Sequence, residues 1–260
     1  MTSTEIAEKL SCIPEKDIEL LTGMMLAERD GDTRRLLIEL LDRVNEYAYL
    51  TENGIPLGGI AYRDFVTGNC PFDLPSPEIV ERYRKTVEKA DAGDPDAQYT
   101  AAMFALEGAV GLPDLDAAVR WLEQAAAAGQ PDALYELGVC RLNGEGTMPD
   151  AAEAVRLFEA AAEKGNVDAM LTLASVYRGA KGIPADDGKV YAWYKRAAEA
   201  GSAYGWMHLG ICTFNGTGTP EDKKKAVEYV ETAEKMGSSE AKMLLKRMER
   251  YLEEAEDEGN

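Results

Sequence analysis

Apolar residues follow a helical spacing in two segments of a stretch that recurs along most of the chain. In residues 132–143 apolar side chains lie three or four positions apart, and the segment 144–149, Gly-Glu-Gly-Thr-Met-Pro, then interrupts the pattern. The helical spacing resumes over residues 151–164 and ends at Gly165. This pattern predicts two helices joined by a tight turn, with a glycine of positive φ closing the second helix.

The same pattern repeats with a period of 36 residues. A glycine that would close a helix recurs in steps of 36, at Gly93, Gly129, Gly165, Gly201 and Gly237. A small residue recurs in phase with it, at Ala97, Ala133, Ala169, Gly205 and Ala241. A fixed period of this length predicts a solenoid, in which each helix pair buries its apolar face against its neighbours. We therefore expect an all-α fold, a right-handed α-solenoid of antiparallel helix pairs.

Small and large side chains occupy fixed positions within the repeat. Small residues fall in one register of the first helix, at Ala102, Gly138, Ala174 and Gly210, and in one register of the second, at Ala125, Ala161, Ala197 and Ala233. Small side chains at facing positions allow two helix backbones to approach closely. Larger side chains in another register are expected to wedge between neighbouring repeats, at Trp121, Leu157, Trp193 and Tyr229.

This pattern resembles the Sel-one-like repeat (SLR), a relative of the tetratricopeptide repeat. The shared motif is Ala-x-x-x-Leu-Gly, then Asn-Gly-x-Gly, then Trp/Phe-x-x-x-Ala-Ala-x-x-Gly, matched best at residues 133–138, 143–146 and 193–201. The resemblance covers residues 94–248. Three places depart from it: Gly108-Ala-Val110 in the first repeat, Ala180-Lys-Gly182 in the third, and Ala233-Glu234 in the last.

The period divides the chain into three parts. Residues 76–248 are expected to form the solenoid, with a half-repeat at each end and four full repeats at 94–129, 130–165, 166–201 and 202–237. Residues 1–75 lack the period and are either an N-terminal helical cap or a small helical domain, with helices expected at about 3–10, 14–29 and 32–50. Residues 249–260 are expected to form a solvated, frayed acidic tail.

The balance of charges restricts the classes of partner. The chain has 47 acidic and 28 basic residues and a formal net charge of −19. Such a chain repels phosphate backbones and anionic membranes, so we expect neither a nucleic-acid nor a membrane partner. If charge governs the choice of partner, the partner is basic. The sequence has neither an apolar stretch of about 18 residues nor a secretory signal, so we expect a cytoplasmic protein.

Chemically reactive residues are few. The four cysteines (Cys12, Cys70, Cys140 and Cys212) form no CxxC or Cys/His cluster, so we expect neither a metal nor a cofactor. The single histidine, His208, lies in a predicted helix and is expected to serve packing or to lie at the surface. The Gly-x-Gly sequences at 144–146 and 216–218 follow helices and precede no Lys-Ser/Thr, so they indicate interhelical turns instead of phosphate-binding loops. We assign no catalytic residue.

The resemblance implies that the first helix of each pair lines a concave face. Helical spacing then selects the side chains expected to bind a partner there: Tyr99, Met103, Leu106, Tyr135, Val139, Leu142, Leu171, Ser175, Arg178, Tyr204, Met207, Ile211 and Phe214. Most are apolar or aromatic where a merely solvated face would be charged, and Tyr, Phe and Met often anchor interfaces. The alternative is that some of them, Tyr99 and Tyr135 above all, serve packing between repeats.

Three functions are compatible with these observations. The first is a non-enzymatic scaffold or adaptor that holds a peptide or a partner protein in the groove, which is the function that the resemblance implies. The second is an acidic inhibitor or decoy that neutralises a basic partner, and it is suggested by the net charge. The third is an enzyme with a site in residues 1–75, where Cys70 is the one candidate nucleophile.

Overall fold

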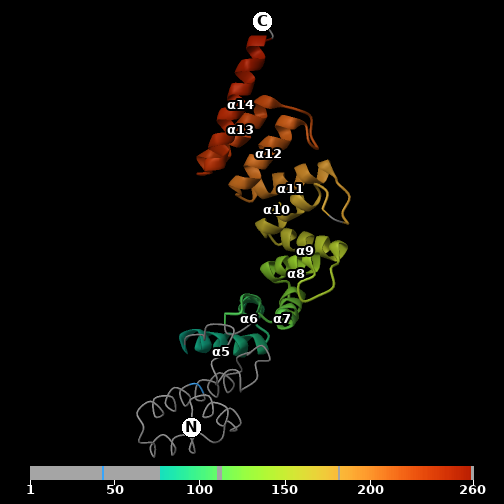
Figure 1. Cartoon of the computed structure of the whole chain (residues 1–260), viewed down its shortest axis with the longest axis vertical. Coiled ribbons are helices and arrows are strands. Elements are labelled where there is room, and N and C mark those ends of the chain that lie inside the picture. Colours follow the sequence, from blue (N-terminus) through green and yellow to red (C-terminus); the bar gives the residue numbers. More distant parts are fainter. Residues whose placement is uncertain (1–42, 44–76, 110–112, 181, 259–260) are drawn as a thin grey trace, which may run out of the picture. The chain divides into compact units, whose positions relative to one another are not determined.

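The computed structural model describes residue 43 and residues 77–109, 113–180 and 182–258 (Figure 1). All regular secondary structure in these residues is helical, which confirms the predicted all-α class. The predicted cap and helices within residues 1–75 lie, apart from residue 43, outside the described residues. The described residues fall into two compact units, divided between Trp121 and Leu122, and each unit is described by itself.

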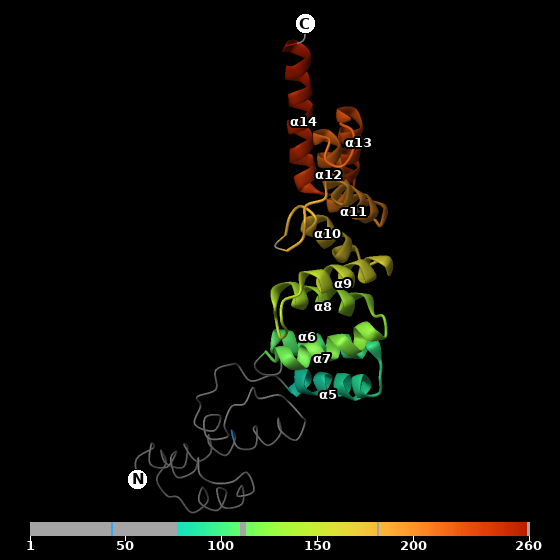
Figure 2. The same cartoon turned by 90° about the vertical axis from the view of Figure 1, so that its right-hand side faces the viewer.

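The helices follow the predicted pairs closely. The N-terminal unit holds α5 (Pro77–Asp91), α6 (Pro95–Glu107) and the first part of α7 (Leu115–Ala127). The C-terminal unit holds the rest of α7 and the helices α8 (Pro131–Asn143), α9 (Ala151–Glu163), α10 (Val167–Val176), α11 (Asp187–Glu199), α12 (Ala203–Asn215), α13 (Lys223–Lys235) and α14 (Ser239–Glu258). Within the C-terminal unit, α8 packs on α9, α10 on α11 and α12 on α13 (Figure 2).

Side-chain caps at the period of the repeat start these helices. The first helix of each pair begins at a residue whose side chain accepts a hydrogen bond from the backbone N–H three positions on, at Asp94, Gln130, Asn166, Ser202 and Ser238. An aspartate caps the second helix in the same way, at Asp114, Asp150, Asp186 and Asp222. Each cap satisfies a backbone donor that the helix itself leaves without a partner.

Glycines end the second helices as the sequence predicts. Gly93, Gly129, Gly165, Gly201 and Gly237 all have φ between 84° and 94°, the left-handed region that favours glycine. Glycines at one position of the repeat also close the first helices. Gly144 ends α8 with a φ of 81°, and Gly216 ends α12 with a φ of 70°. The third repeat has Ala180 at this position, and the positive φ moves to Gly179, at 112°. Because the left-handed residue comes earlier, α10 is shorter than its counterparts and ends at Val176.

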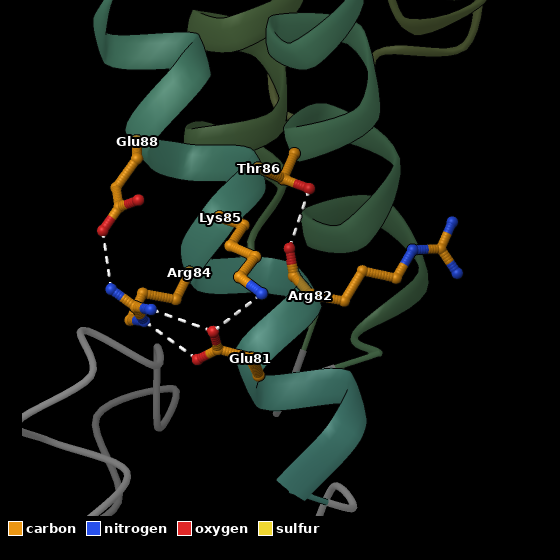
Figure 3. Close-up of polar contacts among 6 residues, drawn as sticks. All are labelled: Glu81, Arg82, Arg84, Lys85, Thr86 and Glu88. Carbon is orange, nitrogen blue, oxygen red and sulfur yellow. Dashed lines mark hydrogen bonds and ion pairs between the residues drawn. The ribbon is translucent and has the colours of Figure 1, made fainter.

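The N-terminal unit packs small residues under one large ring. Ala90 of α5 and Ala97 and Ala101 of α6 are buried together, and Trp121 of α7 packs against them. Trp121 therefore packs on a cluster formed by α5, the preceding half-repeat, and by α6 of its own repeat. On the outside of α5, Arg84 donates to both Glu81 and Glu88, at 2.9 and 2.7 Å (Figure 3).

The core of the C-terminal unit depends on close approach of helices at the small positions. A Cβ built on Gly138 of α8 would lie 2.6 Å from the ring of Phe158 in α9, and one on Gly210 of α12 would lie 2.5 Å from a methyl group of Val230 in α13. The facing alanines Ala161, Ala197 and Ala233 are fully buried. The first and second helices of a pair therefore approach too closely for larger side chains at these positions.

The large core side chains lie mainly one residue beyond the predicted wedge register. The most buried ones in the second helices are Leu122, Phe158, Tyr194 and Val230, at 0, 0, 3 and 0% exposure. Leu157 and Tyr229 are only half-buried and pack against the edge of the core.

The C-terminal segment differs from the prediction. Helix α14 continues through Glu258, so the residues expected to be a frayed tail are largely helical. The apolar spacing of Leu245, Met248 and Leu252 extends the helix beyond residue 248. Among the described helices, none is long and apolar enough to span a bilayer.

Candidate functional site

The predicted groove residues of the N-terminal unit all lie on one helix. Tyr99, Met103 and Leu106 belong to α6 and are half-buried. Their partly covered side chains are compatible with packing as well as with binding.

In the C-terminal unit, the predicted residues separate by exposure. Tyr135, Val139, Leu142 and Leu171 are half-buried and pack against the main core cluster. The ring of Tyr135 lies 5.7 Å from that of Phe158. Arg178, Ser175 and Tyr204 are exposed, and Ile211 and Phe214 are half-buried. The exposed members therefore gather around α12 and the end of α10.

One predicted groove residue is a core residue. Met207 is only 7% exposed and packs with Ala226, Val230 and Ala233 of α13 and with Leu245 of α14. The prediction for Met207 was wrong because α13 and α14 cover this position in the last full repeat.

A polar hollow of about 270 Å³ lies on one side of α12. Its lining joins the end of α10, the first eight residues of α11 and the C-terminal half of α12, and includes Arg178, Asp187, Tyr194, His208 and Asn215. Ile211, Cys212, Val190 and Thr217 complete it. The hollow therefore combines an arginine, an amide and aromatic rings, which are groups that recognise polar peptide atoms.

His208 packs against two tyrosine rings in this hollow. Its ring stacks on that of Tyr194 at 4.8 Å and 16°, and lies 4.2 Å from that of Tyr204. Burial, with a further contribution from the positive charge of Arg178, lowers the pKa of His208 from 6.5 to about 4. His208 is therefore neutral at physiological pH and forms an aromatic wall of the polar hollow.

Arg178 is the cation of the polar hollow. Its guanidinium donates a hydrogen bond to the hydroxyl of Tyr194, which opposes the rise that burial causes in the pKa of that tyrosine. Within the described part of the chain, Arg178 forms no salt bridge.

An apolar hollow of about 260 Å³ lies between α12 and α14. Ile211, Phe214, Leu244, Met248 and Tyr251 supply its apolar and aromatic lining, and Asn215 and Arg247 its polar atoms. The rings of Phe214 and Tyr251 meet edge to face at 5.5 Å. Ile211 and Asn215 also line the polar hollow, so the two hollows flank a shared ridge of α12. We refer to the two hollows together as the α12 site.

Four residues of the α12 site were missed by the sequence reasoning. Leu244, Arg247, Met248 and Tyr251 lie on α14, which was expected to be a half-repeat followed by a tail. The spacing of Leu244, Met248 and Tyr251 by four and three residues was the signal that could have revealed them.

The described residues show no arrangement typical of catalysis. Cys140 and Cys212 are buried free thiols, and burial raises the pKa of each to about 11, which disfavours the nucleophilic thiolate. No group of three His, Cys, Asp or Glu side chains in the described ranges is placed to hold a metal ion. Cys70 and Cys12 lie outside those ranges. The α12 site can therefore bind through shape, aromatic contacts and hydrogen bonds.

Comparison with known proteins identifies the repeat. The sequence profile of the family described as Sel1 repeat matches residues 95–130, 131–166, 167–202 and 207–238. No curated protein matches the sequence significantly.

Two solved structures resemble the fold. One is a protective antigen present in uropathogenic *Escherichia coli* strains and displaying an SLR fold, with 31% identity over 61% of this chain and 34% of that chain, and a TM-score of 0.58. The other is a Sel1 repeat protein from Oxalobacter formigenes, with 26% identity over 59% of this chain and 63% of that chain, and a TM-score of 0.56. The match spans about a third of the antigen and under two thirds of the second protein.

Proposed function

The chain belongs to the Sel1 repeat family. We propose that it is a non-enzymatic scaffold that binds a segment of a partner protein at the α12 site of its C-terminal unit. Sel1 repeat proteins generally act as protein–protein interaction scaffolds. In this proposal the partner lies across α12, the end of α10 and the middle of α14.

The observation that carries the proposal is the exposure of large aromatic residues beside the two hollows. Tyr204 is 46% and Tyr251 49% exposed, and each contacts a lining residue of a hollow, His208 or Phe214. Tyrosine and arginine are enriched among the residues that dominate binding energy at protein interfaces. Exposed aromatic rings that border concave surface are typical of a binding site.

The test is capture of partners from a native cell extract with the intact chain and a Tyr204→Ser/Tyr251→Ser variant. Both side chains are about half exposed, so their removal leaves the repeat core in place. Tyr135 is a poor choice for such a test, because its ring packs on Phe158 and an aspartate there would disturb the core. The matched control is Met148→Ser, which removes an 82% exposed apolar side chain far from both hollows in the sequence.

We expect the intact chain and the Met148→Ser control to retain the same partner, and the tyrosine variant to lose it while circular dichroism shows unchanged helicity. A partner that the tyrosine variant retains in full would contradict the proposal. The alternative of an acidic decoy rests on the net charge of −19, and it predicts capture that the tyrosine variant leaves unchanged. The alternative of an enzyme in residues 1–75 concerns a segment outside the described residues and remains a hypothesis.

A further inference from the structure

The α12 site has two chemically different halves at a fixed separation. The apolar hollow lies between α12 and α14, and the polar hollow lies on the other side of the ridge of Ile211 and Asn215. Both hollows border the same helix, α12, and a helix with its side chains is about 10–12 Å across, so an occupant of both spans roughly that distance. An occupant that fills both hollows needs a bulky apolar group and a polar group that are separated by about the same distance as the hollows.

The apolar hollow fits one large side chain. Its volume of about 260 Å³ and its lining of Phe214, Met248 and Tyr251 suit an aromatic or leucine side chain. Methionine adapts to the shape of an inserted group, and the edge-to-face pair of Phe214 and Tyr251 offers a further aromatic surface.

Each hollow carries an arginine that has no carboxylate partner in the described part of the chain. Arg247 lines the apolar hollow and Arg178 the polar one, and neither forms a salt bridge there. Of the other arginines described, Arg84, Arg141, Arg156 and Arg196 pair with glutamates, and Arg82, Arg120 and Arg250 form no salt bridge in that part of the chain. Arg178 and Arg247 differ from these last three because they line the hollows, where a guanidinium can bind a carboxylate from outside.

The charged residues that line the two hollows have a different balance from the whole chain. Two arginines, Arg178 and Arg247, stand against one carboxylate, Asp187, although the chain as a whole has a net charge of −19. Lys223 adds a cation near the apolar hollow, with its Nζ 4.9 Å from the ring of Tyr251. Its own carboxylate partner is Glu221, at 3.2 Å. The lining of the two hollows therefore carries more positive than negative charge, which favours an anionic group within them.

Two groups of carboxylates limit where such a segment can lie. Asp187 lines the polar hollow, but it lies in the first turn of α11, where the helix dipole offsets its charge. On α8 and α10, Asp132 and Asp168 raise the pKa of Glu136 in addition to the effect of burial. These carboxylates would repel an anionic segment, which favours a position over α12 and α14 and the end of α10, away from α8.

We infer that the α12 site binds an acidic segment of a partner protein, with a bulky apolar side chain in the apolar hollow and a carboxylate at Arg178 and Arg247. The inference rests on the proposed function, because it names the partner of the same surface. An extended chain rises about 3.3 Å per residue. The acidic and apolar residues of the segment are therefore about three positions apart.

The experiment is a selection of displayed random peptides, about twelve residues long so that they span both hollows, on the full chain. The expected result is enrichment of peptides in which Asp or Glu lies about three residues from Phe, Leu, Trp or Tyr. The leading peptide is then measured by fluorescence polarisation against the intact chain, Arg178→Gln/Arg247→Gln, and Arg250→Gln. Arg250 lies on α14 as Arg247 does but does not line the apolar hollow, so it controls for the loss of positive charge alone.

We expect the double variant to weaken peptide binding by about tenfold or more, because it removes charge-assisted hydrogen bonds, and Arg250→Gln to change it by less than about threefold. Enriched peptides rich in Lys or Arg would overturn the acidic assignment. Acidic peptides that bind the double variant as well as the intact chain would overturn the location, and so would the absence of any enriched peptide. In each of these cases the proposed function is judged separately, by whether the Tyr204/Tyr251 variant loses its partner from the extract.

Discussion

The ring of Phe158 occupies the space that a side chain on Gly138 would need, since a Cβ at that position would lie 2.6 Å from Cε1 of Phe158. Gly138 belongs to α8 and Phe158 to α9, so this contact sets how closely the two helices of one repeat approach. Phe158 is fully buried and cannot swing into solvent. The small residue at this position is therefore a requirement of packing.

We predict that Gly138→Ala destabilises the fold. Overpacking a tight core costs about 1–3 kcal/mol, whereas the higher helix propensity of alanine offsets up to about 1 kcal/mol. The free energy of unfolding, measured by urea denaturation, is expected to fall by about 1–2 kcal/mol. The variant Gly138→Ala/Phe158→Leu is the control, because leucine vacates part of the ring volume. The explanation would be contradicted if the double variant lost more free energy of unfolding than the two single variants lose together.

The aspartate caps give a second prediction. The carboxylate of Asp150 accepts a hydrogen bond from the N–H of Glu153 at 2.9 Å, and the N–H of Asp150 donates to the carbonyl of Arg141. Asp150→Ala removes the first bond and keeps the second, so we expect a loss of about 1 kcal/mol in the free energy of unfolding. Asp150→Ser, which keeps a capping oxygen, should lose much less. Equal losses in the two variants would show that the cap is not the cause.

The period of the glycines made the helices and their ends predictable from the sequence. A helix that ends with a residue in the left-handed conformation needs a positive φ at that position, and glycine is the residue that tolerates it. The caps at Asp114, Asp150, Asp186 and Asp222 follow the same 36-residue period and were therefore also predictable from the sequence. The shortening of α10 was harder to predict, because it depends on whether Gly179 or Ala180 takes the left-handed conformation.

The candidate site was predictable only in part. Arg178, Tyr204, Ile211 and Phe214 follow from the helical spacing of the first helices, and they lie in or beside the two hollows. Met207 has the same kind of position and a similar side chain, yet it is buried. Helical spacing identifies the face of a helix but not which neighbouring helix covers it, and the cover here is α13 and α14.

His208 gives a prediction about pH. Its pKa is about 4 in the folded chain against an ordinary value of 6.5, so the unfolded chain takes up a proton in that interval that the folded chain does not. Above pH 6.5 both forms are neutral and His208 contributes nothing to the pH dependence of stability; as the pH falls from 6.5 toward 4, stability is lost. We expect the urea midpoint to fall between about pH 7 and about pH 5.

The control for this prediction is His208→Phe, which keeps an aromatic ring beside Tyr194 and Tyr204 but cannot titrate. The raised pKa of Glu136 acts in the opposite direction, because the folded chain binds that proton more readily. Comparison of the variant with the intact chain isolates the contribution of His208. If both proteins lose stability equally between the two pH values, His208 is not the group responsible.

The salt dependence of partner binding separates the scaffold from the decoy. Exposed charges interact over a Debye length of about 10 Å at 0.1 M salt, and this distance shrinks as salt is added. A basic partner attracted by the net charge of −19 would lose more than about tenfold in affinity between about 50 and 500 mM salt.

For an acidic segment at the α12 site, salt instead screens the long-range repulsion from the rest of the chain, while contacts within the half-buried hollows are screened less. We therefore expect the affinity of the captured partner, measured by isothermal titration calorimetry, to change by less than about threefold or to rise. A steep loss of affinity with salt would favour the decoy.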